Sequence, residues 1–211
     1  MKSERVIAYV DGFNLYFGLK SNNWKCYYWL NVYNLCQHLT KPPQHLIQVK
    51  YFTSRITKST PEKRKRQSTY IEALGTLENV KLYYGKYEWS PITCRKCGYQ
   101  DEMPEEKMTD VQIGVEMVAD AYQNKYDTAF LIGGDLDQVP SIEVVRRSFP
   151  QKRVVAIFPP NRQRDELRGT ANAYLHITES LLKRSILPLE ITKQGGYILK
   201  CPEEWIKTVS L

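Results

Sequence analysis

The feature that most constrains this chain is the alternation of short apolar runs with stretches of helical spacing. One apolar run, over residues 5–10, ends at Asp11, and the strongest, over residues 128–134, ends at Asp135. Such alternation favours the α/β class, a mostly parallel sheet flanked by helices. We expect strands over residues 5–10, 45–56, 80–89, 128–134, 153–158 and 174–177. We expect helices that begin near residues 13, 32, 61, 110, 140 and 166. The helix that begins at residue 61 is expected to end at residue 77, and the helix that begins at residue 166 at residue 173.

The length of 211 residues favours one domain with elaborations. We place that domain at residues 1–184. Residues 90–107 hold two prolines, a CxxC and many charges, which indicates a surface insertion. Residues 185–211 form a C-terminal extension, in which Gly195-Gly196 stands between two alternating runs and predicts a hairpin.

The balance of charge is basic. Lys and Arg number 30 against 23 Asp and Glu, a formal net charge of +7. Cationic side chains displace counterions from phosphates, so the excess suits a polyanion such as RNA, although many basic proteins bind no nucleic acid. Association of two copies of the chain stays open.

Neither a membrane span nor a secretory leader is expected. No apolar run reaches the ~18 residues of a transmembrane helix, and the N-terminus lacks a long apolar segment and a small-residue cleavage site. The five cysteines are an odd number in a chain too large to need disulfides, so reduced thiols in a cytoplasm are expected.

Four aspartates are predicted to meet at one edge of the sheet. Asp11 and Asp135 follow strands, Asp137 lies two residues further, and Asp110 begins the helix before the second strand. In open α/β sheets the reactive groups collect beyond the carboxyl ends of the strands. Crowded carboxylates repel one another unless a cation neutralises them, and oxygen ligands suit Mg²⁺ or Mn²⁺. These four residues are therefore the candidate catalytic and metal-binding residues, here for metal-assisted cleavage of a phosphodiester.

Each aspartate also has a structural explanation. Asp135 suits the cap of the following helix, Asp11 a turn, and Asp110 an N-cap after Thr109. The convergence of all of them on one edge favours the metal site.

Two segments carry a resemblance to a known family. YVDGFNLY, residues 9–16, resembles the opening motif of the NYN domain, in the PIN-like nuclease superfamily. Residues 107–142 resemble its second block, an Asp at the head of a helix and then a strand ending in Ser-Gly-Asp-x-Asp. The likeness runs from Val6 to about Leu182 and implies a PIN-like sheet and metal-dependent ribonuclease chemistry. It carries the acidic roles to Asp11, Asp110, Asp135 and Asp137, with Asn14 orienting a ligand or substrate.

The chain departs from the family pattern at three positions. Gly133 replaces the usual Ser and removes a hydroxyl near the metal or phosphate. Glu116 stands where Asp is common, and as the longer side chain it is expected to support the site. Asn172 stands where an acid is expected.

Further candidates lie outside these motifs. Cys94 and Cys97 form half of a zinc site, which needs two more ligands from Cys26, Cys36, Cys201, His38 or a second chain; an unliganded thiol pair is the alternative. Arg162 and Arg164 follow a strand and are the expected RNA phosphate contacts. The run of residues 63–66 is expected to face solvent. The aromatic cluster of residues 24–29 could stack on bases, although most such clusters belong to a core or an interface.

Three functions compete. The first is a metal-dependent ribonuclease. The second is an RNA- or partner-binding adaptor with the same fold and little turnover. The third, a Toprim-like or phosphatase-type metal enzyme, fits least, because the first strand ends in Asp11-Gly12-Phe13 and lacks both the DxD and the Glu that those enzymes place there.

Overall fold

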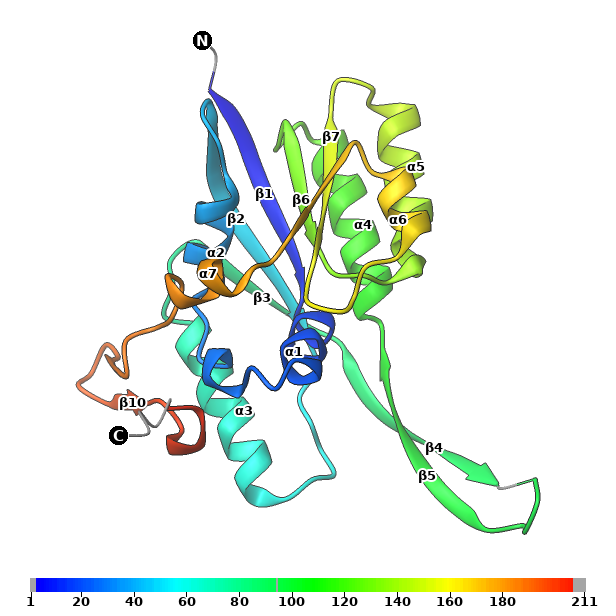
Figure 1. The fold of residues 1–211 in the computed structure, drawn as a ribbon, viewed down its shortest axis with the longest axis vertical. Helices are drawn as coiled ribbons and strands as arrows, with labels where there is room; N and C mark the ends of the chain where they lie inside the picture. Colours follow the sequence, from blue (N-terminus) through cyan, green and yellow to red (C-terminus); the bar gives the residue numbers. More distant parts are fainter. Residues whose placement is uncertain (1–2, 94, 207–211) are drawn as a thin grey trace.

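A six-stranded parallel sheet forms the centre of the molecule (Figure 1). The structure is a computed structural model that describes residues 3–93 and 95–206. The strand order is β3-β2-β1-β6-β7-β8, so the α/β class and the parallel sheet are confirmed. The strands are β1 (Glu4–Asp11), β2 (Gln44–Thr53), β3 (Val80–Tyr84), β6 (Thr128–Ile132), β7 (Arg153–Phe158) and β8 (Ala173–His176).

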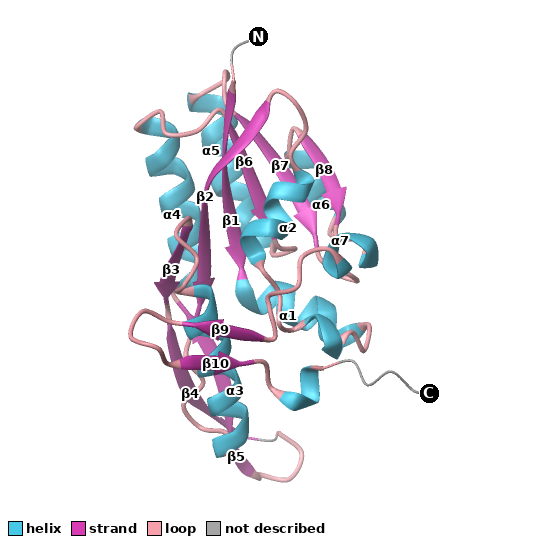
Figure 2. Cartoon of the chain, turned by 90° about the vertical axis from the view of Figure 1, so that its left-hand side faces the viewer, coloured by secondary structure: helices cyan, strands magenta, loops and turns pink. Residues whose placement is uncertain are grey.

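Helices cover both faces of this sheet (Figure 2). Side chains alternate along β1, so Val6 and Val10 enter one apolar core and Ile7 and Tyr9 enter the other. The first core is completed by α1 (Gly12–Ser21), α2 (Val32–Leu39) and α7 (Glu179–Lys183), and the second by α4 (Thr109–Tyr122), α5 (Val139–Ser148) and α6 (Asp165–Thr170). No helix among the described residues is long and apolar enough to cross a membrane.

The C-terminal extension packs on α3 (Pro61–Leu74). It contains the predicted hairpin, formed by β9 (Glu190–Thr192) and β10 (Ile198–Lys200), with Gly195 and Gly196 at φ of 98° and 84° in the turn. Leu199 and Trp205 of the extension join a third apolar cluster with Trp29 and Ala73. The extension therefore rests on the body of the domain through apolar contacts.

The insertion is an antiparallel β-ribbon that projects from the body (Figure 1). Its strands are β4 (Lys86–Thr93) and β5 (Gln100–Lys107). The expected strand over residues 80–89 is thus two strands, and the insertion begins at residue 86 instead of 90. Gly85 separates the two strands. Only glycine fits at this position, because a Cβ there would lie 2.6 Å from the carbonyl of Lys107 and 2.7 Å from Ser54 Oγ.

Two predicted helices end early. The helix expected over residues 61–77 ends at Leu74, with Gly75 as its C-terminal cap. The helix expected over residues 166–173 ends at Thr170, because Asn172 exchanges hydrogen bonds of 2.8 and 2.9 Å with the backbone of Val154. That exchange directs the next residue, Ala173, into β8 at the edge of the sheet.

Candidate functional site

The strand order reverses direction between β1 and β6. β2 and β3 lie on one side of this pair, and β7 and β8 lie on the other. Such a switch point leaves a crevice beyond the carboxyl ends of the two strands, where α/β proteins bind their ligands. Asp11 is the last residue of β1, and Asp135 comes three residues after the end of β6.

Asp11 is buried at this edge, with 8% of its surface exposed. Its Oδ1 accepts a hydrogen bond of 2.8 Å from the backbone N–H of Asn14, so it caps α1. Its Oδ2 accepts one of 3.0 Å from Asn14 Nδ2. Burial raises the pKa of Asp11 and the charge of Asp135 adds to the rise, while the bonds from Asn14 oppose it. The structural role expected for Asp11 and its place in the site therefore coexist.

Asn14 joins the ends of the two strands. While its amide nitrogen donates to Asp11, its Oδ1 accepts a hydrogen bond of 3.2 Å from the backbone N–H of Gly134. On its other side Gly134 allows the Arg162 backbone to pass close by, because a Cβ at Gly134 would lie 1.8 Å from the carbonyl oxygen of Arg162. Asn14 thus links the carboxylate of Asp11 to the backbone that follows β6.

Asp135 and Asp137 lie on the turn after β6. Asp135 Oδ1 accepts a hydrogen bond of 3.1 Å from the backbone N–H of Asp137, which caps one turn of 3₁₀ helix, Leu136–Gln138. Asp135 is half-buried and Asp137 is exposed. The expectation that Asp135 caps the helix over residues 139–147 is therefore wrong: Gln138 holds the cap position of α5, and Asp135 caps the short turn before it.

Asp110 completes the set from the first turn of α4. The cap position of that helix is Met108, at φ 82°, so the expectation of an N-cap at Asp110 is wrong. Burial raises the pKa of Asp110 to about 6, and the charges of Asp11, Asp135 and Asp137 contribute to the rise. The charges of the other three predicted aspartates therefore act on Asp110.

A fifth carboxylate, Glu106, interacts electrostatically with Asp11 and Asp110. It lies at the end of the ribbon that joins the body. Its Oε1 accepts a hydrogen bond of 3.0 Å from the buried Ser54 hydroxyl. Burial raises its pKa to about 7, and the charges of Asp11 and Asp110 add to the rise. Sequence reasoning missed Glu106, because it assigned residues 90–107 to a surface insertion. Its only sequence signal is its position four residues before Asp110.

Glu116 does not lie with these acids. Its Oε2 accepts hydrogen bonds of 2.7 Å from Lys50 Nζ and 2.9 Å from the Tyr83 hydroxyl. Lys50 is buried and also pairs with the buried Asp120. Glu116 therefore neutralises a buried lysine under α4. These contacts direct Glu116 to Lys50 and Tyr83 and not to the aspartates that it was expected to support.

The two predicted RNA-binding arginines lie in the loop after β7. The Arg162 guanidinium stands over the Phe17 ring of α1, 5.7 Å from its centroid, and the Arg162 backbone passes Gly134. Arg164 is exposed and precedes α6. Both arginines thus remain beside the edge that carries the aspartates.

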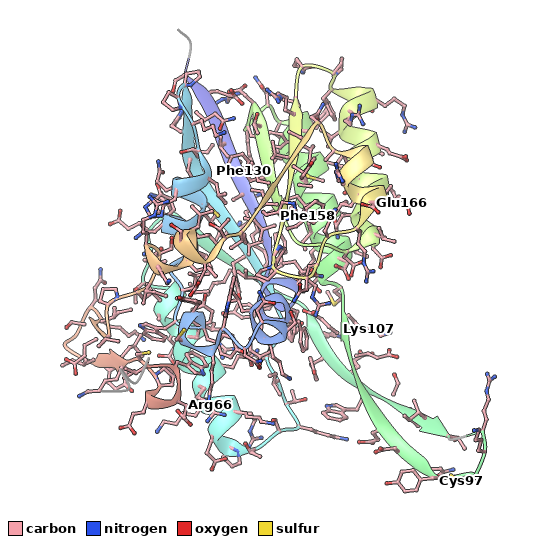
Figure 3. All side chains as sticks on the ribbon, in the orientation of Figure 1. Arg66, Cys97, Lys107, Phe130, Phe158 and Glu166 are labelled. Carbon is pink, nitrogen blue, oxygen red and sulfur yellow. The ribbon has the colours of Figure 1, made fainter. Side chains whose placement is uncertain are left out.

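Among the described residues, no three His, Cys, Asp or Glu side chains are gathered to hold a metal ion, so none completes a zinc site with Cys97. Cys97 is exposed at the tip of the ribbon (Figure 3), and Cys94 lies outside the described residues. Cys36 and Cys201 are buried in the body, and His38 pairs with Ser185. The described residues therefore add no zinc ligands to Cys97, and a second chain or an unliganded thiol pair remains as the alternative.

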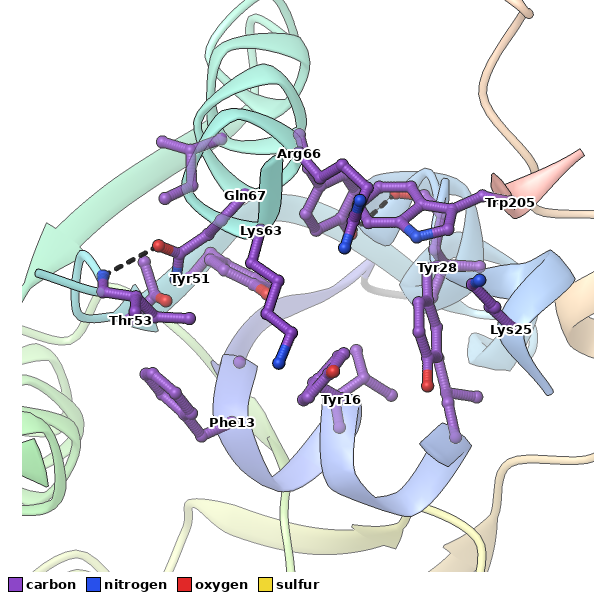
Figure 4. A pocket seen from close by; sticks show the side chains of 17 residues that line it. Phe13, Tyr16, Lys25, Tyr28, Tyr51, Thr53, Lys63, Arg66, Gln67 and Trp205 are labelled. Carbon is purple, nitrogen blue, oxygen red and sulfur yellow. Dashed lines mark hydrogen bonds between the residues drawn. The ribbon is translucent and has the colours of Figure 1, made fainter. Parts of the chain in front are cut away.

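An aromatic cavity of about 210 Å³ adjoins α1 on the side of α3 (Figure 4). Lys63 and Arg66 line it. Residues 63–65 are exposed, as expected, whereas Arg66 is half-buried. In the aromatic cluster of residues 24–29, Tyr27 and Trp29 belong to the core, whereas Tyr28 lines the cavity. No sequence signal joined these residues, because they come from segments far apart in the chain.

The molecule is an α/β domain with a parallel sheet and with Asp11 and Asp135 at its switch point. A family model for the NYN domain matches residues 5–179, most of the chain. The protein belongs to the NYN domain family, as the sequence motifs predicted.

The chain is similar to one protein of known name and to one solved structure. The 6-hydroxy-3-succinoylpyridine 3-monooxygenase of Pseudomonas putida is 24% identical over 195 residues, and the match covers 75% of this chain. The chain spans 61% of that protein's length. A crystal structure of a Vibrio parahaemolyticus protein of unknown function superposes with a TM-score of 0.56 at 20% identity, covering 89% of this chain and all of that one. This second likeness concerns the fold alone.

Proposed function

We propose that this protein is a divalent-metal-dependent endoribonuclease. The observation that carries the proposal is the position of Asp11 and Asp135 at the carboxyl ends of β1 and β6, which Asn14 joins by hydrogen bonds to Asp11 and Gly134. The charges of Asp11, Asp135 and Asp137 also act on Asp110. Membership of a family with a nuclease-type fold and a net charge of +7 support it. The substrate class is single-stranded RNA, whose phosphates the basic residues would contact.

The chemistry of the side chains fits Mg²⁺ or Mn²⁺. All the acids at the edge offer carboxylate oxygens, the ligands these ions prefer. Burial, with neighbouring carboxylates adding to the rise, raises the pKa of Asp11 and of Asp110, and a bound cation would stabilise their charged forms. Among residues 3–93 and 95–206, no three His, Cys, Asp or Glu side chains are already gathered to hold an ion. Mg²⁺ needs fewer, since it binds through one or two carboxylates with waters and a substrate phosphate.

Each residue then has a defined task. A bound metal would supply an activated water and stabilise the leaving oxygen. Asp11 and Asp135 would hold it, and Asp110 and Asp137 would complete its surroundings. Asn14 keeps Asp11 in one orientation through its bond to Oδ2. Arg162 and Arg164 would hold the RNA backbone.

Two other functions have an observation in their favour. An RNA- or partner-binding adaptor is favoured by Gly133, which lacks the hydroxyl usual in the family. Binding of a small heteroaromatic acid is favoured by the aromatic cavity and by the substituted pyridine in the name of the Pseudomonas relative. At 24% identity, that name gives the weaker support.

One assay separates these functions. Labelled single-stranded RNA is incubated with the purified protein and Mn²⁺ or Mg²⁺, beside the Asp135→Asn variant and a protein-free control. The proposal expects cleavage that needs both the metal and Asp135. RNA binding without cleavage would identify an adaptor. If the protein neither binds nor cleaves RNA, binding of a small heteroaromatic acid becomes the favoured function.

A further inference from the structure

The cavity beside α1 has aromatic walls and a solvent-exposed rim. Phe13 and Tyr16 line it from α1, Tyr70 from α3, and Tyr28 and Trp205 from the segment after α1 and from the C-terminal extension (Figure 4). Tyr16 is 40% exposed, and its ring centroid lies 5.0 Å from that of Tyr28. An engineered cavity of about 150 Å³ is enough to hold benzene. A cavity of about 210 Å³ therefore accommodates one planar heterocycle.

Three cationic side chains surround this aromatic space. Lys25, Lys63 and Arg66 line the cavity, and Arg66 pairs with Glu204 at 2.6 Å. Lys63 makes no ion pair with any residue in the described part of the chain. Figure 4 shows its ammonium group directed into the cavity between Phe13 and Tyr16. The preferred occupant therefore carries an anion beside its ring.

The cavity and the acidic edge share the start of α1. Asp11 caps the helix, and the next residue, Gly12, lines the cavity. Gly12 allows Tyr51 to approach, because a Cβ at Gly12 would lie 2.6 Å from the Tyr51 ring and hydroxyl. Burial raises the pKa of Tyr51, and the charge of Asp11 adds to the rise. A ligand in the cavity therefore lies next to the site where cleavage is proposed.

We propose that this cavity binds one base of the single-stranded RNA substrate, and that Lys63 holds the phosphate beside that base. The inference rests on the proposed function and deepens it, because a base held at α1 places a neighbouring phosphodiester at the aspartates. Aromatic side chains bind bases of any sequence by stacking, since every base presents a π face. Flat aromatic walls with an adjacent cation suit a nucleotide better than an aliphatic chain, which has neither a π face nor a charge.

The first test measures RNA affinity by fluorescence anisotropy in EDTA, on an Asp135→Asn background, so that neither metal nor cleavage is needed. Tyr16→Ala is compared with Tyr122→Ala, a tyrosine that is 79% exposed on α4. Lys63→Ala is compared with Lys65→Ala, an exposed lysine on the same helix that does not line the cavity. Thermal melts of all four variants confirm that they are folded.

We expect Tyr16→Ala to weaken binding at least about fivefold, the lower end of the effect of losing one base stack. Lys63→Ala should also weaken binding and should lower the salt slope by about 0.7, the value for one phosphate contact of a single strand. The Tyr122 and Lys65 variants should bind like their parent. Equal affinity of the Tyr16 and Tyr122 variants would overturn the inference.

A second test needs no stability argument. Ligand-observed NMR compares adenosine 5′-monophosphate, ribose 5-phosphate and pyridine-3-carboxylate as probes of the protein that carries only Asp135→Asn. The inference requires binding of the nucleotide and much weaker binding of the sugar phosphate. Equal binding of these two probes would exclude recognition of the base. Binding of the pyridine acid alone would assign the cavity to a small heteroaromatic acid.

The two proposals fail separately. Loss of base binding with metal-dependent cleavage intact would remove only the cavity inference. Base binding without any cleavage under Mn²⁺ or Mg²⁺ would remove the ribonuclease proposal and leave a nucleotide-binding cavity.

Discussion

Asn14 Nδ2 lies 3.0 Å from Asp11 Oδ2, and the same amide group accepts a hydrogen bond from the backbone of Gly134 through its oxygen. One side chain therefore fixes the orientation of a buried carboxylate and connects the ends of β1 and β6. A carboxylate that is already held in one orientation loses less conformational entropy when a metal or substrate binds to it.

Asn14→Ala should reduce activity more than stability. It removes two hydrogen bonds, each with a net effect of about 1 kcal/mol, and leaves the backbone N–H that Asp11 caps. We expect a loss of about 1–2 kcal/mol in the free energy of unfolding and about 10–100-fold in cleavage rate. Asn34→Ala is the matched control, since Asn34 also stands three residues after a capping residue, Asn31, but lies exposed on α2. Equal rates for the two variants would contradict the role given to Asn14.

Asp135→Asn should abolish cleavage and leave the fold at least as stable in a chelator. The Asn oxygen keeps the cap on the Asp137 backbone, while the negative charge that repels Asp11 and Asp110 is removed. The rate should fall at least about 100-fold, as for loss of a metal ligand. Asp127→Asn is the comparison: it breaks a two-oxygen pair with Arg5 and should cost about 1 kcal/mol without abolishing cleavage. A large drop in melting temperature for Asp135→Asn would make that residue a structural cap.

Glu106 should make the metal-free protein less stable as pH rises. Its pKa rises from 4.5 to about 7 on folding. Between these values the folded state holds a proton that the unfolded state has released, so the free energy of unfolding falls with increasing pH. The penalty is complete above about pH 7 and absent below about pH 4. In urea titrations with EDTA, Glu106→Gln should match the wild type at pH 4 and exceed it by about 1 kcal/mol at pH 8, after allowance for partial exposure. Parallel curves would exclude this role.

The two glycines after β6 should respond differently to substitution. A Cβ at Gly133 would lie 3.4 Å from Asp11 Cβ, an ordinary contact, whereas one at Gly134 would lie 1.8 Å from the Arg162 carbonyl. Gly133→Ser should therefore fold normally and restore the hydroxyl usual in the family, with cleavage at least as fast. Gly134→Ala should cost about 1–3 kcal/mol or more through overpacking. Chemical denaturation and the RNA assay measure both, and a well-folded Gly134→Ala protein would show that the loop moves easily.

Arg162 and Arg164 should contribute to RNA affinity without regard to sequence. The double Arg162→Ala, Arg164→Ala variant should weaken binding to every single strand and reduce the salt slope by about 0.7 for each phosphate that the arginines no longer neutralise. Arg153→Ala, an exposed arginine at the start of β7 and thus at the opposite end of that strand, is the matched control. An unchanged slope in the double variant would place the RNA path elsewhere.

The sequence by itself determined the sheet and the main acids. Asp11 and Asp135 each follow an apolar strand, and parallel strands align their carboxyl ends, so local pattern was enough to bring them to one edge. The family motifs rest on the same local pattern. Local signals were less reliable at element ends, where Gly85 and Asn172 act through contacts with distant backbone.

Only the tertiary structure decided the rest of the site. Glu106 lies near the aspartates because its carboxylate accepts a hydrogen bond from Ser54. Glu116 is directed away from them because it pairs with the buried Lys50 of β2. The cavity joins α1, α3 and the C-terminal extension, and places Lys63 beside Tyr16. Such contacts depend on which surfaces pack together, and neither residue spacing nor composition encodes that packing one segment at a time.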